Sequence, residues 1–213
     1  MKKLLLVSAL LMFFSAAYAQ NYYPVTDAGL RAGTTRLELY GGMVLPQSSW
    51  NHNGQKVDLG TTGWSAGLGF YRNISRVVAL GLDGNYAQFG DGDKMNEGTA
   101  DESYFRTGAA TGLVALRVNF FPRHSTRLYI PAGIGVGHVF VRENFQGGSH
   151  KTYDSTDLAG MLGAGLEFDI DETVIFGMEG RYYLVETRSD VKSAFGKGHL
   201  HYGEVLLKFG FKF

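Results

Sequence analysis

The last stretch of the chain, Leu200–Phe213, reads LHYGEVLLKFGFKF and decides the fold. Every second residue from Val205 to Phe213 is Val, Leu or Phe, whereas the opposite face carries Glu204, Lys208 and Lys212. A period of two is typical of a β-strand and not of a helix. Such a strand either buries its apolar face in a soluble core or turns that face to lipid around a polar lumen.

The same alternation recurs along most of the chain. Earlier segments with one apolar and one polar or glycine-rich face lie at residues 37–43, 64–71, 78–86, 114–120, 128–140, 158–169 and 174–184. Together with the last stretch they predict about eight strands, which matches the smallest common membrane barrel. We therefore predict an all-β fold, an eight-stranded antiparallel up-and-down transmembrane β-barrel over residues 35–213.

Short and long connections alternate strictly between these segments. The short ones lie at residues 72–76, 122–126 and 171–172, and the long polar ones lie at 46–61, 90–103, 143–155 and 189–199. Short periplasmic turns and long outer loops give this pattern in membrane barrels. The pattern predicts that both ends of the barrel domain lie on the side of the short turns.

The first segment has the features of a secretory signal. Lys2 and Lys3 precede the apolar run Leu4–Phe14, and Ala17-Tyr18-Ala19 provides a small-x-small cleavage site. We predict a signal peptide at residues 1–19 and a periplasmic leader at 20–34. The chain has no Cys, and its 20 acidic and 20 basic residues balance. This composition excludes a disulfide framework and gives no indication of a nucleic-acid partner.

Charged residues on the strands gather on the face opposite the apolar one. The predicted lumen set is Glu38, Asp83, Arg117, Glu167, Glu179, Arg181, Glu204 and Lys208. These residues either form a self-satisfied ion-pair network that plugs the barrel or line a path for protons or ions; we favour the network because buried charges must be paired. Inward charges also argue against a soluble lipocalin-like barrel, whose interior is apolar.

Aromatic residues on the apolar faces fall into two groups. Trp64, Tyr86 and Tyr182 lie towards the long loops, whereas Phe70, Phe120, Phe168 and Phe213 lie towards the short turns. Two such groups predict the aromatic girdles that mark the two interfaces of a membrane barrel.

Strand number, loop asymmetry, the mixed-charge lumen and the terminal Phe213 together resemble the eight-stranded outer-membrane barrels of Gram-negative bacteria, the group related to the OmpA membrane domain. Proteins of this group end in an aromatic residue that the barrel-assembly machinery reads, and Phe211 and Phe213 match this insertion signal. Lys208 stands where the family signal often has Gly. The resemblance implies an outer-membrane location and contact with lipids, including lipopolysaccharide. We expect a monomer without a periplasmic peptidoglycan-binding domain.

These features predict a small non-enzymatic barrel that acts as a membrane scaffold, with surface loops for recognition or envelope integrity. Two alternatives remain, a narrow channel for ions or very small solutes and a lipid A-modifying enzyme. We predict no catalytic residues, because the adjacent pair His124-Ser125 falls in a turn at the wrong end of the barrel.

We also predict no metal and no cofactor. The acidic loop at residues 90–102 begins like a calcium loop, but Met95 occupies a ligand position and the required Gly is missing. Cationic residues in or near the long loops could contact lipopolysaccharide phosphates. They are Lys56, Arg142, Lys151, Arg188, Lys192 and Lys197.

Overall fold

The computed structural model describes residues 30–47, 49–52, 55–58, 60–95, 102–145, 148–188, 190–196 and 198–213. The predicted signal peptide and most of the predicted leader lie outside the described residues. The barrel strands are β1 (Thr35–Pro46), β4 (Gly63–Asn73), β5 (Val78–Gln88), β7 (Ser103–Phe120), β8 (Thr126–Phe145), β9 (His150–Asp169), β10 (Val174–Glu186) and β11 (His199–Lys212). Four smaller elements lie between them: β2 (Ser49–His52), β3 (Gln55–Asp58), β6 (Lys94–Met95) and α2 (Asp190–Phe195).

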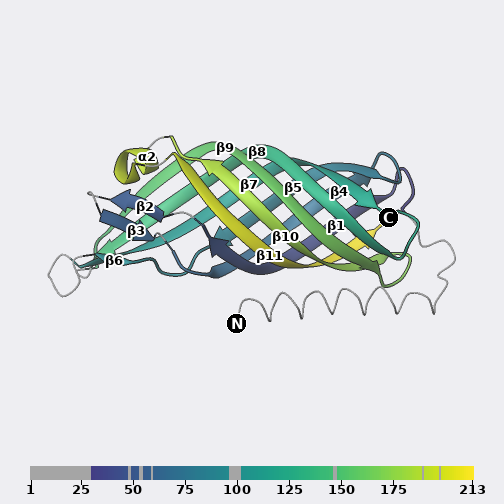
Figure 1. Cartoon of the computed structure of the whole chain (residues 1–213), viewed down its shortest axis with the longest axis horizontal. Coiled ribbons are helices and arrows are strands. Elements are labelled where there is room, and N and C mark those ends of the chain that lie inside the picture. Colours follow the sequence, from purple (N-terminus) through teal and green to yellow (C-terminus); the bar gives the residue numbers. More distant parts are fainter. Residues whose placement is uncertain are drawn as a thin grey trace.

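The barrel strands run antiparallel, and each pairs with the strands before and after it in the chain (Figure 1). The first and last strands pair with each other in the register Leu39 with Phe209, so the sheet closes on itself and leaves no free edge in the barrel wall. The predicted fold, an eight-stranded antiparallel barrel, is confirmed. Closure satisfies the backbone hydrogen bonds, which lipid cannot do.

The two ends of the barrel differ. One end, hereafter the turn end, carries the turns at residues 74–77, 121–125 and 170–173. Both ends of the barrel domain lie here, because the Thr35 amide donates to the Phe213 carbonyl at 2.9 Å. The opposite end, hereafter the loop end, carries β2, β3, β6 and α2 (Figure 1). Among the described residues, no helix is long and apolar enough to cross a membrane.

The strands are longer at the loop end than the sequence indicated. A loop was predicted at residues 143–155, but β8 continues to Phe145 and β9 begins at His150. The sequence did not reveal the strand, because Phe145 and Tyr153 are the only large apolar residues at 143–155 and they set no period of two. The polar residues here stay paired, since Arg142 lies opposite Thr152 and Asn144 lies opposite His150.

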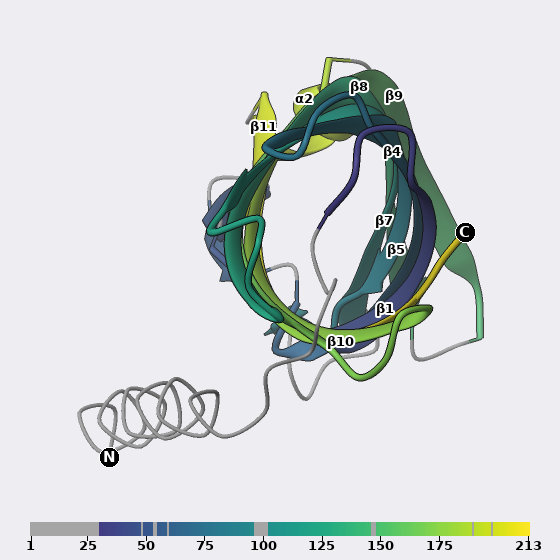
Figure 2. The ribbon, with the colours of Figure 1, turned by 90° about the vertical axis from the view of Figure 1, so that its right-hand side faces the viewer.

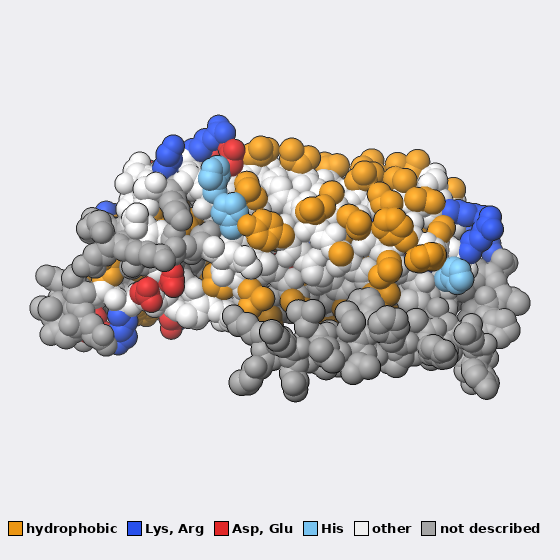
Figure 3. All heavy atoms as spheres, viewed as in Figure 1, with side chains coloured by type: hydrophobic (Ala, Val, Ile, Leu, Met, Phe, Trp, Pro, Cys, Tyr) orange, Lys and Arg blue, Asp and Glu red, His pale blue; other side chains and the backbone are white. Residues whose placement is uncertain are grey.

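Along the middle of the barrel the apolar side chains point outward. Leu82 and Ile134 are each 61% exposed and Val205 is 58% exposed, whereas their neighbours Asp83 and Glu204 are buried. Figure 3 shows hydrophobic side chains covering this band of the surface. A barrel wall of this kind suits hydrocarbon outside and polar groups inside.

Towards the loop end the polarity of the wall reverses. Arg106, Arg142 and Thr152 point outward and are exposed, whereas Phe105 and Val141 point inward and are fully buried. The same strands are thus built for lipid along one part and for water along the next. Strands that extend beyond a membrane need this reversal, because each exposed face must match its own solvent.

The inverted wall predicts a depth-dependent effect of charge. Ile134→Arg should lower the free energy of unfolding by about 2–4 kcal/mol, because Ile134 faces lipid in the middle part of β8. The measurement is urea unfolding in lipid vesicles followed by tryptophan fluorescence. Thr152→Arg is the matched control, and it should change stability little because Thr152 is exposed beyond the apolar band. Equal effects of the two substitutions would contradict the assigned lipid-facing band.

Candidate functional site

The lumen holds all eight charged residues that the sequence assigned to it. Their side chains come from six strands and all are buried, with 1% to 6% of each residue exposed. Buried charges are tolerated when they are paired and hydrogen-bonded. The arrangement of these eight residues therefore decides what the lumen can do.

Glu167 on β9 organises the part of the lumen nearest the turn end. Its carboxylate forms ion pairs with Arg36 at 3.3 Å, with Arg127 at 2.8 Å and, at close range, with Arg117. Arg127 also grips Asp169, donating from Nη1 to Oδ2 at 2.6 Å. Three guanidinium groups from β1, β7 and β8 thus converge on one carboxylate from β9.

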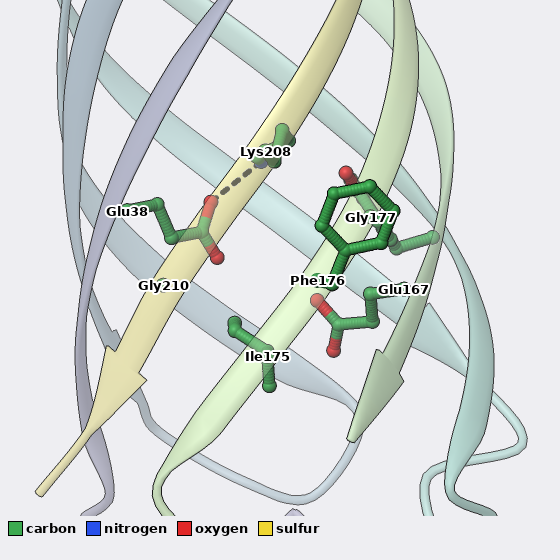
Figure 4. Close-up of a pocket in the computed structure, with 8 residues that line it drawn as sticks. Glu38, Glu167, Ile175, Phe176, Gly177, Lys208 and Gly210 are labelled. Atoms are coloured by element: carbon green, nitrogen blue, oxygen red, sulfur yellow. Dashed lines mark ion pairs between the residues drawn. The ribbon is translucent and has the colours of Figure 1, made fainter. Parts of the chain in front are cut away.

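Glu38 on β1 joins this group to a second group deeper in the barrel. It pairs with Arg117 at 2.8 Å and with Lys208 at 2.5 Å, and Lys208 also contacts Glu179 at 2.6 Å. Figure 4 shows the Glu38–Lys208 pair between β1 and β11. Arg181 extends this series of ion pairs, since it binds Glu179 at 2.6 Å and Asp83 at 2.9 Å. One continuous ion-pair network thus ties the opposite walls of the barrel together.

Tyrosines add further hydrogen bonds to the network. Tyr40 and Tyr71 donate to Asp83 at 2.7 and 2.9 Å, and Tyr129 donates to Glu179 at 2.8 Å. The Arg117 guanidinium also lies over the Tyr129 ring, 3.3 Å from its centroid. These contacts satisfy carboxylate oxygens and hold the arginines in place.

Glycines on the inner wall make room for these rings. A Cβ atom at Gly67 would lie 2.5 Å from the Tyr40 ring, and one at Gly165 would lie 2.2 Å from the Tyr129 ring. Neither position can therefore carry a side chain while the tyrosines stay where they are. Part of the high glycine content thus reflects a tightly filled lumen.

Glu204 stands apart from the other seven. Within the described part of the chain it has no ion pair, and its carboxylate accepts a hydrogen bond from Asn85 Nδ2 at 2.8 Å. Sequence reasoning missed Arg127, which it assigned to no site. Arg127 shares the parity of Tyr129 and opposes Leu128 and Ile130, so the alternation of β8 contained the signal.

The network borders a small cavity. A cavity of about 10 Å³ remains among Glu38, Tyr129, Glu167 and Lys208 (Figure 4). A space of this size is about what a single water molecule requires. An eight-stranded barrel is just wide enough for its side chains to fill it, and here they do.

Apolar side chains fill the lumen at the loop end. Trp50 from β2 and Phe195 from α2 meet with ring centroids 5.5 Å apart, and Phe195 also packs against Phe105 and Tyr153 at 5.6 and 5.3 Å. We call this cluster the apolar plug. The long connections were expected to be polar, and this was wrong for the buried Trp50 and Phe195, because tertiary packing draws these isolated aromatics into the barrel.

The predicted aromatic residues lie on the outer surface. Trp64, Phe70, Tyr86, Phe120, Tyr182 and Phe213 are between 37% and 70% exposed, and Phe168 is partly buried. Trp64 and Tyr86 contact each other with centroids 5.6 Å apart. Phe211 and Phe213, the predicted insertion signal, are 42% and 70% exposed.

The remaining predicted residues are only partly described. Asn96, Glu97 and Asp101 of the acidic loop and the side chain of Lys56 lie outside the described residues, as does Lys197. No group of three or more potential metal ligands forms among the residues that the structure describes. The loop-end cations Arg142, Lys151, Arg188 and Lys192 are exposed.

A family model described as the outer membrane protein beta-barrel domain matches residues 6–213. The chain belongs to this family. Known members of the fold are similar in structure though distant in sequence. OprG from Pseudomonas aeruginosa superposes with a TM-score of 0.52 and 19% identity, over 87% of this chain and 98% of OprG. Neisserial surface protein A superposes with a TM-score of 0.52 and 12% identity, over 85% of this chain and 99% of that one. No curated protein matches the sequence.

The network predicts a strong dependence of stability on Arg117. Arg117→Met should lower the free energy of unfolding by about 3–5 kcal/mol, because it removes a partner from both Glu38 and Glu167 in a buried site. The measurement is the temperature at which heat changes the mobility of the protein on a gel, together with urea unfolding.

Arg106→Met is the matched control for that experiment. It breaks the exposed pair of Arg106 with Asp91, so its effect should stay below about 1 kcal/mol. An unaltered heat transition in Arg117→Met would contradict the idea that the network stabilises the barrel.

Proposed function

We propose that this protein is a closed, non-enzymatic scaffold of the outer membrane, whose barrel anchors it and whose loop end meets the surroundings of the cell. The observation that carries the proposal is the continuous ion-pair network across the lumen. Ions or solutes could pass at membrane depth only if paired buried charges separated, which is costly in a low-dielectric interior.

Two further barriers support a closed barrel. At the loop end the apolar plug fills the lumen above the network. At the turn end residues 30–34 lie across the mouth, as Figure 2 shows. The Leu30 amide donates to the Pro122 carbonyl at 2.9 Å and the Gly33 amide donates to the Asn73 carbonyl at 2.7 Å. For a solute to pass, the ion-pair network, the apolar plug and residues 30–34 would all have to move.

The outer surface suits the partners expected from the sequence. Exposed Arg142, Lys151, Arg188 and Lys192 lie at the loop end, where lipopolysaccharide phosphates would stand in an outer membrane. Phe211 and Phe213 present an exposed aromatic end that the barrel-assembly machinery would read. A rigid barrel with variable loops is a common platform for recognition.

Planar-bilayer recordings test the closed scaffold against the channel. The wild-type protein should give no discrete conductance at high protein load. The double variant Trp50→Ala/Phe195→Ala should also stay silent, because the network below the plug remains intact. Discrete openings of the wild-type protein would reject the scaffold in favour of a channel.

Lipid A composition tests the scaffold against the enzyme. Mass spectrometry of lipid A from cells with and without the protein should give the same acyl pattern, because a scaffold alters no ester or amide bond. A gain or loss of one acyl chain that depends on the protein would establish an enzyme instead.

A further inference from the structure

Two neighbouring turns at the turn end share an unusual surface. The turn after β4 exposes Ile74 and Val77, 63% and 43% exposed, and the turn after β7 exposes Phe121 at 61%. Arginines flank these apolar side chains in both turns. We call Arg72, Arg76 and Arg123, all exposed, together with these three apolar residues, the basic rim.

The two turns form one surface because β5 pairs with β7. Asn119 at the end of β7 binds the Val77 carbonyl twice, from its backbone amide at 2.7 Å and from Nδ2 at 3.2 Å. Phe121 has a φ of 56°, a left-handed conformation that is unfavourable for a residue with a side chain. The His124 amide donates to the Phe121 carbonyl at 3.0 Å and so holds this turn. The Phe121 ring is thus presented outward by a fixed backbone.

The arginines of the basic rim differ from those of the lumen. Within the described part of the chain, none of Arg72, Arg76 and Arg123 forms an ion pair, whereas the lumen arginines all do. The exposed acids at this end, Asp171 and Glu172, lie in a different turn, between β9 and β10. Figure 3 shows basic side chains gathered at the turn end, next to the hydrophobic band. Among the described residues, the positive charge of the basic rim is therefore not balanced by an ion pair with a carboxylate.

The position of this charge indicates its partner. Arg72 follows Phe70 on the outward face of β4, so the lowest lipid-facing aromatic and the first arginine are next-nearest neighbours on one face. The apolar tips continue the lipid-facing surface into the turns. Arginine matches phosphate oxygens with a two-pronged donor, and an anionic membrane surface attracts such cations. Exposed apolar side chains beside them suit the boundary between headgroups and acyl chains.

We propose that the basic rim binds the phosphate groups of anionic phospholipids in the leaflet at the turn end. A protein partner is less suited to the site, because the basic rim is continuous with the surface that faces lipid. This inference rests on the proposed membrane placement of the barrel but goes beyond it. Binding at the basic rim would give the barrel a preference among lipids. It would also help the lipid-facing aromatic side chains to fix the depth of the barrel in the membrane.

Native mass spectrometry tests the proposal. Folded protein is released from detergent micelles that contain equal amounts of phosphatidylglycerol and phosphatidylcholine, and the retained lipids are counted. The wild-type protein should retain phosphatidylglycerol preferentially. The variant Arg72→Gln/Arg76→Gln/Arg123→Gln should lose this preference by about tenfold or more. The control Lys94→Gln/Arg106→Gln removes two exposed cations at the loop end that are assigned to no lipid contact, and it should keep the preference.

The gel-mobility assay separates this proposal from the proposed scaffold. If the rim variant keeps the wild-type heat transition but retains phosphatidylglycerol as the wild-type protein does, the lipid site is rejected and the barrel stands. If the variant Arg72→Gln/Arg76→Gln/Arg123→Gln does not fold, Arg76→Gln and Arg123→Gln are tested singly. Each should lower the preference for phosphatidylglycerol. A wild-type protein without any lipid preference, or one whose basic rim cross-links to a periplasmic protein instead of lipid in cells, would also overturn the proposal.

Discussion

Closure of the sheet between β1 and β11 is the constraint on which the rest of the structure depends. Hydrocarbon offers no partner to a backbone amide or carbonyl, so a strand that crosses it must be paired on both sides. The register of Leu39 with Phe209 provides that pairing for the first and last strands. Because the wall is closed and narrow, every inward side chain shares one small space, and the chemistry of the lumen follows from it.

The side chains in the lumen fit together through ion pairs and through the packing of tyrosine rings against glycines. Glu167 and Glu38 each accept several cationic partners, so the network neutralises charges that come from opposite walls. Tyr40 and Tyr129 lie against glycines and satisfy carboxylates that the cations leave open. A half-satisfied network would cost more than an apolar core. Ion pairing of seven of the eight predicted charges is therefore the feature that makes a charged barrel interior compatible with a stable and closed protein.

At the loop end the wall is polar outside and apolar inside, because water and not lipid surrounds this part of the barrel. Above the apolar band the wall faces water, and the interior is filled by Trp50, Phe195 and the side chains around them. Single strands run through both parts without interruption. β7, for example, places Arg117 inside the charged part of the lumen and Phe105 inside the apolar part. The barrel thus combines a membrane segment with an ordinary hydrophobic core, stacked along one axis.

The sequence alone determined the barrel, the orientation of its faces and eight of the buried charges, because a period of two assigns each side chain to one side of a strand. Family membership agrees with that prediction. The tertiary structure alone decided which charges meet, why Glu204 is left out and how Arg127 enters. It also decided that Trp50 and Phe195 return into the lumen. Those contacts join residues far apart in the chain, such as Arg36 and Glu167, and alternation along one strand carries no information about the strand across the barrel.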